Sequence, residues 1–261
     1  MIEKLHINMT SFNVDRLIRV YLPENYKNET ESYPVLYMHD GQNVFNDEDA
    51  IGGHSIQLEQ FLNEKEMKLI VVAIDQNSEE RMNEYCPWKN GQYSRKIVGR
   101  IDPTGGKGKQ YIEFIVNELK PYIDKKYRTL KDQNSMAGIS LGGLISTYAA
   151  CVYPNIFRNV AVLSSAFFRN QEEIEKLLQE ADLSQLKKFY LDCGSEEVKT
   201  DKMISKEFVN SNNEIYEILR KKDIRVKFNV IEDAEHHYLY FRQRVPEIFK
   251  YLCTNDERIR L

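Results

Sequence analysis

The sequence predicts a single α/β domain over residues 1–261, with a mainly parallel sheet and helices on both of its faces. Two observations carry this prediction. Short, almost continuously apolar runs alternate with longer helical patterns along the chain, which is typical of parallel strands covered on both faces. In addition, no Pro/Gly-rich linker and no internal repeat divides the 261 residues, so one domain is favoured over two.

Strand-length apolar segments define the expected sheet. The first of them, 17–22, alternates in the manner of a half-exposed edge strand. The inner strands are expected at 34–39, 69–74, 136–139, 160–163, 189–191 and 226–231.

Helical patterns lie between these strands. In segment 110–127 apolar side chains recur at helical spacing on one face, and Pro121 is expected to bend or tighten this helix without ending it. Segment 141–153 is small and apolar nearly all round, as expected for a helix buried against a sheet. Further amphipathic helices are expected at 172–180, 206–222 and 243–252. Segment 77–109 is polar and turn-rich, and we expect a functional loop there, lying over the site.

Composition and charge exclude several classes of protein. A net charge of -4 argues against a dedicated nucleic-acid-binding protein. The amino terminus lacks the apolar stretch of a secretory signal, and the longest uninterrupted apolar run, 69–74, is too short to span a membrane. The four cysteines are far apart without a C-x-x-C pair. We therefore expect reduced thiols in a cytoplasmic protein, with no zinc site and no membrane partner.

Residues 138–142 read Gly-Ile-Ser-Leu-Gly, the G-x-S-x-G pattern, with Ser140 at its centre. An apolar strand pattern ends just before Ser140 and a helical pattern follows it, which is the strand-turn-helix setting of a nucleophile elbow. The flanking glycines are needed there because the turn is tight and side chains would collide. The motif predicts a serine nucleophile at the carboxyl edge of the sheet.

A serine hydroxyl needs an adjacent base, and the base needs an orienting carboxylate. In sheets of this kind the acid and then the histidine follow the serine along the chain. Only His236 and His237 follow Ser140, so the base is one of these two. The acid is expected after strand 189–191, where Asp192, Glu196 and Glu197 compete and their spacing does not rank them.

The turn after strand 34–39 is expected to contribute to an oxyanion hole. A backbone N–H near Gln42 would supply one donor and the N–H of Leu141 the other. Gly41 is expected to let the chain adopt the required φ/ψ. His39 and Asp40 could be mistaken for a catalytic pair, but we expect them to shape the turn by hydrogen bonds.

Several segments together resemble the putative esterase family of α/β hydrolases, which includes enterochelin-esterase-like enzymes, S-formylglutathione hydrolase, and feruloyl and acetylxylan esterases. The resemblance covers nearly the whole chain. The segments that carry it are RVYLP (19–23), LYMHDGQN (36–43), RMNEY (81–85), GKG (106–108), FIVNELKPYID (114–124), YRT (127–129) and AGISLGGL (137–144).

The resemblance implies an α/β-hydrolase fold, with a twisted, mostly parallel central sheet and an active-site loop insertion. The family's pattern of a histidine, an aromatic residue and an amphipathic helix matches 235–241 and implies His236 as the base. Family members carry Asp or Glu three residues after a glycine, here Gly194, which implies Glu197 as the acid. The implied reaction is acyl transfer from an ester to Ser140, without a metal or organic cofactor.

Within the insertion, Arg81, Tyr85 and Trp88 are expected to form part of a substrate-binding wall, although a salt-bridged Arg81 and a packed Trp88 are equally ordinary explanations. The expected function is a serine carboxylic-ester hydrolase acting on a small ester, such as an acetyl or aryl ester of a sugar or related compound. An acyltransferase with the same triad and a catalytically silent binding module are the alternatives. The sequence leaves open the natural ester and whether the chain forms a homo-oligomer.

Overall fold

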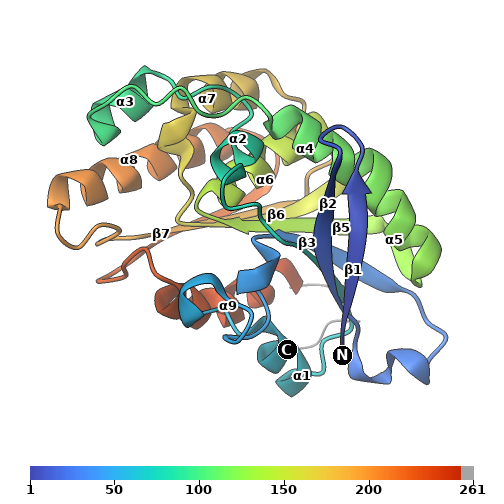
Figure 1. Cartoon of the computed structure of the whole chain (residues 1–261). Coiled ribbons are helices and arrows are strands. Elements are labelled where there is room, and N and C mark those ends of the chain that lie inside the picture. The colour runs from blue at the N-terminus through green and yellow to red at the C-terminus, as the bar shows by residue number, and fades with distance from the viewer. Residues whose placement is uncertain (254–261) are drawn as a thin grey trace.

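The computed structural model describes residues 1–253, and within them eight strands form one sheet (Figure 1). The strand order is β1-β2-β4-β3-β5-β6-β7-β8. β2 is antiparallel to both of its neighbours and the other pairs are parallel, which confirms the mainly parallel sheet. Residues 254–261 of the predicted domain lie outside the described part. The strands are β1 (Ile2–Met9), β2 (Val14–Tyr21), β3 (Tyr33–His39), β4 (Ile70–Ile74), β5 (Thr129–Ile139), β6 (Phe157–Leu163), β7 (Lys188–Gly194) and β8 (Arg225–Ile231).

The prediction that segment 17–22 is a half-exposed edge strand is wrong. β1 forms that edge, and β2 lies inside the sheet between β1 and β4. The one charged residue of that segment, Arg19, is buried and paired with Asp75, and Arg16 just before the segment is buried and paired with Glu84. A buried charge is tolerated where it is paired and hydrogen-bonded. The alternation of polar and apolar residues in this segment therefore does not mean that its polar side faces solvent.

Helices cover both faces of the sheet, because alternate residues of each strand point to opposite sides. In β3, Val35 and Tyr37 pack in one core, whereas Leu36 and Met38 pack in the other. Figure 1 shows α1 and α9 below the sheet and the longer remaining helices above it. The main helices are α1 (Leu58–Glu64), α4 (Gly108–Phe114), α5 (Lys120–Lys126), α6 (Leu141–Val152), α7 (Gln171–Glu180), α8 (Lys202–Leu219) and α9 (Tyr238–Cys253).

The helix predicted over 110–127 is present and continues past Pro121 as expected, but the turn before Pro121 is wider rather than tighter. The π-helical turn η4 (Ile115–Leu119) joins α4 to α5, and the amide of Lys120 donates to the carbonyl of Ile115, five residues earlier. Proline has no N–H to donate to the preceding turn. The helix therefore widens just before Pro121 and continues beyond it.

Segment 77–109 is more ordered than a loop. It contains the short helices α2 (Arg81–Tyr85) and α3 (Gln92–Val98), and a bridge between Lys89 and Gly105 closes the segment on itself. Cys86 and Tyr85 are fully buried within it. The segment is therefore an insertion with its own short helices and a buried interior.

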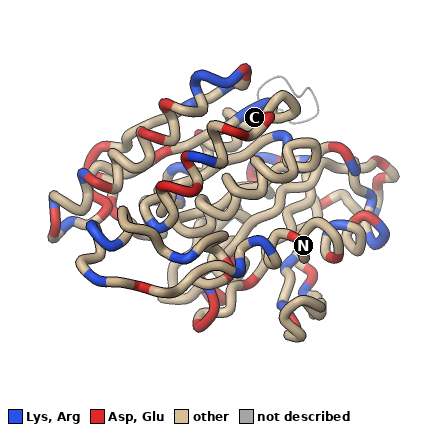
Figure 2. Tube along the Cα trace, turned by 90° about the horizontal axis from the view of Figure 1, so that it is seen from above, with Lys and Arg blue, Asp and Glu red and all other residues tan. Residues whose placement is uncertain are grey.

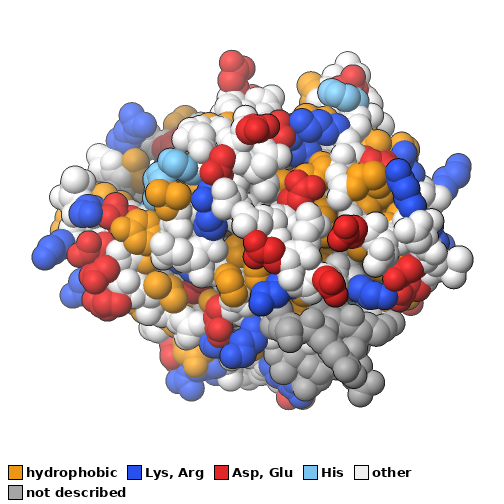
Figure 3. Space-filling view, turned by 90° about the horizontal axis from the view of Figure 1, so that it is seen from below, with side chains coloured by type: hydrophobic (Ala, Val, Ile, Leu, Met, Phe, Trp, Pro, Cys, Tyr) orange, Lys and Arg blue, Asp and Glu red, His pale blue; other side chains and the backbone are white. Residues whose placement is uncertain are grey.

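Surface charges of both signs are mixed. Seen from above, positive and negative segments alternate along the helices of that face (Figure 2). Seen from below, hydrophobic side chains are scattered among charged ones (Figure 3), as on an ordinary protein surface. All four cysteines are buried. Of the helices in residues 1–253, none is long and apolar enough to span a membrane.

Candidate active site

Ser140 occupies a sharp turn between β5 and α6. Its backbone has φ 60° and ψ −121°, a conformation that non-glycine residues rarely adopt. A Cβ atom on Gly138 would lie 2.1 Å from the carbonyl oxygen of Gly142, so only glycine fits there. The amide of Ser140 donates to the Leu163 carbonyl at 3.0 Å. The turn is therefore held by the adjacent strand β6, and Ser140 itself is half-buried.

The turn after β3 lies directly against this elbow. A Cβ atom on Gly142 would lie 3.3 Å from the Cβ of His39. Leu141 is the first residue of α6, and Gln42 lies in the short 3-10 helix η2 (Gly41–Asn43). Backbone N–H groups in the first turn of a helix have no partner within that helix. The two amides expected to bind an oxyanion thus belong to neighbouring helix starts.

The expected reason for Gly41 is wrong. The residue of this turn in the left-handed region is Asp40, with φ 56°, and Gly41 does not have a positive φ. A Cβ atom on Gly41 would instead lie 2.6 Å from Asp75 Oδ1 and 2.8 Å from the backbone of Ala73. Gly41 is needed because η2 is pressed against the end of β4.

Side chains behind η2 hold Asp40 in its unusual conformation. Arg81 donates to both carboxylate oxygens of Asp40, at 2.7 and 2.8 Å, and the Asp40 amide donates to the hydroxyl of Tyr85 at 3.1 Å. His39 Nδ1 lies 2.9 Å from the hydroxyl of Tyr111. Burial lowers the pKa of His39 to about 4, so this imidazole is neutral near pH 7. As expected, His39 and Asp40 shape the turn through hydrogen bonds.

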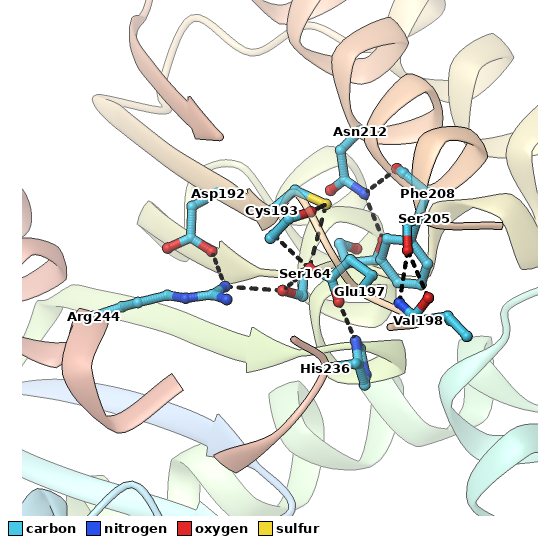
Figure 4. A network of polar contacts seen from close by, with 12 residues as sticks. Ser164, Asp192, Cys193, Glu197, Val198, Ser205, Phe208, Asn212, His236 and Arg244 are labelled. Atoms are coloured by element: carbon cyan, nitrogen blue, oxygen red, sulfur yellow. Dashed lines mark hydrogen bonds and ion pairs between the residues drawn. The ribbon is translucent and has the colours of Figure 1, made fainter. Parts of the chain in front are cut away.

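His236 and Glu197 come together beyond the ends of β7 and β8. Nδ1 of His236 lies 2.6 Å from Oε2 of Glu197 (Figure 4), and the His236 amide donates to the Glu197 carbonyl at 3.2 Å. The Glu197 side chain has 0% of its surface exposed and that of His236 has 31%. The carboxylate is therefore enclosed, while part of the imidazole remains accessible.

Gly194 allows the loops after β7 and β8 to approach each other. A Cβ atom on Gly194 would lie 2.1 Å from the carbonyl oxygen of Ala234. That carbonyl accepts from the Glu196 amide at 3.1 Å, and Ser195 Oγ accepts from the Asp233 amide at 2.9 Å. Backbone contacts between the loops thus bring Glu197 and His236 within hydrogen-bond distance.

The two adjacent histidines have different surroundings. The ring of His236 packs against those of Phe208 and Phe241, with centroids 5.4 and 5.3 Å away. The ring of His237 instead faces His54 at 5.3 Å, and His237 is exposed. Of the pair, His236 is the one that contacts a carboxylate in the described structure.

The three carboxylates that compete in the sequence also differ. Burial by itself would raise the pKa of Glu197, but hydrogen bonds from His236, Ser164 and the Gly194 amide outweigh burial, and the pKa is lowered. Asp192 is fully buried and bonds Arg244 and Tyr190 instead. Burial raises the pKa of Asp192 to about 6. Only Glu197 of the three contacts His236 within residues 1–253.

The structure does not support Tyr85 as a substrate-binding residue, because its side chain is fully buried and serves the Asp40 turn. Arg81 is 23% exposed but is engaged by Asp40. Trp88 packs edge-on against Tyr148 at 5.4 Å. The ordinary explanations, a salt-bridged Arg81 and a packed Trp88, therefore describe both residues.

Sequence reasoning missed two buried polar residues behind Glu197, Ser164 and Arg244, and it did not anticipate that Asp192 pairs with Arg244. One signal was available for Arg244. It lies on the same stripe of α9 as the buried Phe241 and Ile248, and a charge on the apolar face of a helix indicates a buried partner. Residues 1–253 contain no group of three or more His, Cys, Asp or Glu side chains placed to hold a metal ion.

Comparison with known proteins extends over most of the chain. The family model described as "Putative esterase" matches residues 9–252. The uncharacterized protein YbbA of Bacillus subtilis is 25% identical over 247 residues, covering 91% of this chain and 92% of YbbA. The ferri-bacillibactin esterase BesA of the same organism is 24% identical over 177 residues, covering 64% of this chain and 60% of BesA.

Solved structures share the fold at low sequence identity. The siderophore hydrolase EstA from Aspergillus nidulans superimposes with a TM-score of 0.79 at 16% identity, covering 97% of this chain and 95% of EstA. An IroE-like serine hydrolase from Shewanella oneidensis gives a TM-score of 0.73 at 18% identity, covering 97% of this chain and 87% of that chain. Both likenesses concern the fold, which is that of the α/β hydrolases.

Proposed function

The chain belongs to the putative esterase family, and on this premise we propose that it is a serine carboxylic-ester hydrolase with Ser140 as nucleophile, His236 as base and Glu197 as acid. One observation carries the proposal. Ser140 stands on the strained turn that ends β5, and the Glu197–His236 pair stands beyond β7 and β8. The carboxyl ends of parallel strands meet at one edge of a sheet, so these groups share that edge.

A continuous set of contacts supports this arrangement. The carbonyl of Ser140 accepts from the Ala166 amide at 3.0 Å. Two residues before Ala166, the hydroxyl of Ser164 bonds Glu197, and Glu197 bonds His236. The loop after β6 therefore links the elbow to the acid and the base.

The proposed mechanism follows from the chemistry of these groups. The ionised Glu197 accepts a hydrogen bond from the N–H at Nδ1 of His236. The proton stays on Nδ1, so the unprotonated Nε2 can take the Ser140 proton as the serine oxygen attacks the ester carbonyl. The amides of Leu141 and Gln42 stabilise the oxyanion. His236 then protonates the departing alcohol, and water releases the acid from the acyl-enzyme.

For the substrate, we propose a small acetyl or aryl ester. The names of the relatives indicate which candidate esters should be tested first. BesA is named as a ferri-bacillibactin esterase and EstA as a siderophore hydrolase. Siderophore esters, catecholate trilactones among them, should therefore be tested before acetylated sugars. Feruloyl esters and thioesters complete the panel. The ester with the highest kcat/KM would identify the substrate class.

The test of the function is loss of activity on removing the nucleophile. Ser140→Ala should abolish hydrolysis of short p-nitrophenyl esters while the folded state, followed by circular dichroism, is retained. Ser165→Ala is the matched control, because Ser165 is a fully buried serine nearby whose hydroxyl has no hydrogen-bond partner in the described structure. Retained turnover by a clean Ser140→Ala preparation would refute the nucleophile. Acylation of an added alcohol in excess of hydrolysis would indicate an acyltransferase instead.

A further inference from the structure

A buried polar network lies behind Glu197, on the side away from His236 (Figure 4). Ser164 follows β6, Asp192 belongs to β7, and Arg244 reaches in from α9. Ser164 and Asp192 are 0% exposed and Arg244 is 4% exposed. None of these side chains has a role in the acyl transfer described above, so their burial together needs a separate explanation.

The donors and acceptors fix the direction of the hydrogen bonds. Nη1 of Arg244 donates to Ser164 Oγ and to Asp192 Oδ1, each at 2.9 Å. A guanidinium group can only donate, so Ser164 Oγ is the acceptor in the first bond. Its single proton is then directed to Oε1 of Glu197. Arg244 thereby sets the orientation of the Ser164 hydroxyl toward Glu197.

The two oxygens of Glu197 are divided between separate partners. Oε1 accepts from Ser164 Oγ, from the Gly194 amide at 2.5 Å and from Cys193 Sγ at 3.4 Å. Oε2 faces Nδ1 of His236. Rotation of the carboxylate would break the bonds on both sides, so the donors on Oε1 hold Oε2 in line with the imidazole.

Two further observations argue that the network is maintained for this purpose. Ser164 has φ 43°, an uncommon conformation for a non-glycine residue, and such strain persists where the surroundings determine it. Nε and Nη2 of Arg244 are buried without a hydrogen-bond partner in the described structure. A buried ion pair with unsatisfied groups contributes little to stability, so stability alone does not explain Arg244.

We propose that Arg244 and Ser164 are positioning residues that act through Glu197 to hold His236 in its reactive orientation. The inference rests on the proposed function, because it concerns the acid and base of that reaction. Asp192 anchors the arrangement from the other side: it accepts from Arg244 and from the Tyr190 hydroxyl at 3.0 Å. The Ser164 amide also donates to the Asp192 carbonyl at 2.8 Å.

Kinetic variants test whether the effect passes through Glu197. Ser164→Ala and Arg244→Met should each lower kcat by about 10-fold to 100-fold, the worth of a charge-assisted hydrogen bond, with little change in KM. In a Glu197→Gln background Ser164→Ala should cause no further loss of kcat, because residues acting through one group are not additive. Ser165→Ala should retain the wild-type kcat.

Removing Arg244 leaves the carboxylate of Asp192 without its cation, which could destabilise the fold. The Arg244 variants therefore need a test that distinguishes loss of positioning from loss of folding. Arg244 lines a surface cavity of about 370 Å³ together with Tyr190 and Gln243. Methylguanidinium should therefore reach the space left by Arg244→Ala and restore part of its kcat. Methylguanidinium should not restore the kcat of Ser164→Ala, because the hydroxyl that Arg244 orients is missing from that variant.

A spectroscopic measurement completes the test without a substrate. The chain has 5 histidines, so the Nδ1 proton of His236 can be assigned by NMR of histidine-labelled protein and by its loss in His236→Gln. Ser164→Ala and Arg244→Ala should shift this resonance, and Ser165→Ala should not. Wild-type kcat together with an unchanged resonance in Ser164→Ala would overturn the positioning role. Turnover by Ser140→Ala would instead overturn the proposed function, whatever the network variants do.

Discussion

Glu197 and His236 lie 39 positions apart in the chain, yet 2.6 Å separates Oε2 of the acid from Nδ1 of the imidazole. The carboxylate is enclosed and the imidazole is partly accessible. A hydrogen bond at this position both orients an imidazole and stabilises its protonated form during a reaction. This hydrogen bond to His236 distinguishes Glu197 from Asp192 and Glu196. The first two predictions follow from it.

The first prediction concerns the identity of the acid. Glu197→Gln should lower kcat by at least about 100-fold, because an amide cannot stabilise the imidazolium or select the reactive tautomer as a carboxylate does. Glu196→Gln is the matched control and should remain near wild type, since Glu196 makes no hydrogen bond to His236 in the described structure and contributes its backbone amide to the loop. Steady-state kinetics on a p-nitrophenyl ester would measure both. A near-normal kcat for Glu197→Gln would remove it from the mechanism.

The second prediction is a dependence of stability on pH. Hydrogen bonds lower the pKa of Glu197 in the folded protein below its ordinary value of 4.5. The unfolded chain therefore binds the proton first as the pH falls, so this group stabilises the fold above about pH 4.5 and loses that effect as the pH drops through its folded value. Urea unfolding at several pH values should show a shallower acid-side loss in Glu197→Gln than in wild type. Equal slopes would contradict the lowered pKa.

Much of this arrangement was predictable from the sequence because its signals are local. The inner strands are near-continuous apolar runs, and the Gly-Ile-Ser-Leu-Gly turn carries its own strand and helix on either side. These features depend on backbone sterics and on burial of both faces of a sheet. Spacing left the base and the acid undecided, and the resemblance to a family selected His236 and Glu197 for these roles.

The parts that were not predictable depend on pairing between distant residues. Arg19 looks like a solvent-facing residue of an edge strand until Asp75 is seen beside it. In the same way, Arg244 and Ser164 acquire a role only when α9 and β6 are brought together behind Glu197. A single sequence records each residue but not the partner that makes its burial tolerable.

The third prediction concerns Arg81, which the sequence suggested as a substrate-binding residue and which the structure pairs with Asp40. Arg81→Met should lower kcat more than it raises KM, because Asp40 precedes the Gln42 amide in the same turn. It should also lower the free energy of unfolding by about 2–3 kcal/mol, less than a fully buried pair because Arg81 is 23% exposed. Adding Asp40→Asn to Arg81→Met should recover stability. A change confined to KM would indicate substrate contact.

The fourth prediction separates the two glycines of the G-x-S-x-G motif. An added Cβ on Gly138 would lie 2.1 Å from the Gly142 carbonyl oxygen, whereas one on Gly142 would lie 3.3 Å from the Cβ of His39. The backbone of Gly142 cannot move far enough to relieve the contact with a Cβ on Gly138. Gly138→Ala should therefore lose about 3 kcal/mol or more of unfolding free energy, or fail to fold. Gly142→Ala should stay within about 1 kcal/mol of wild type, because alanine favours the first turn of α6 and offsets the tighter contact. Thermal melts would compare the two variants, and equal destabilisation would mean that the turn after β3 cannot move by the few tenths of an ångström that Gly142→Ala requires.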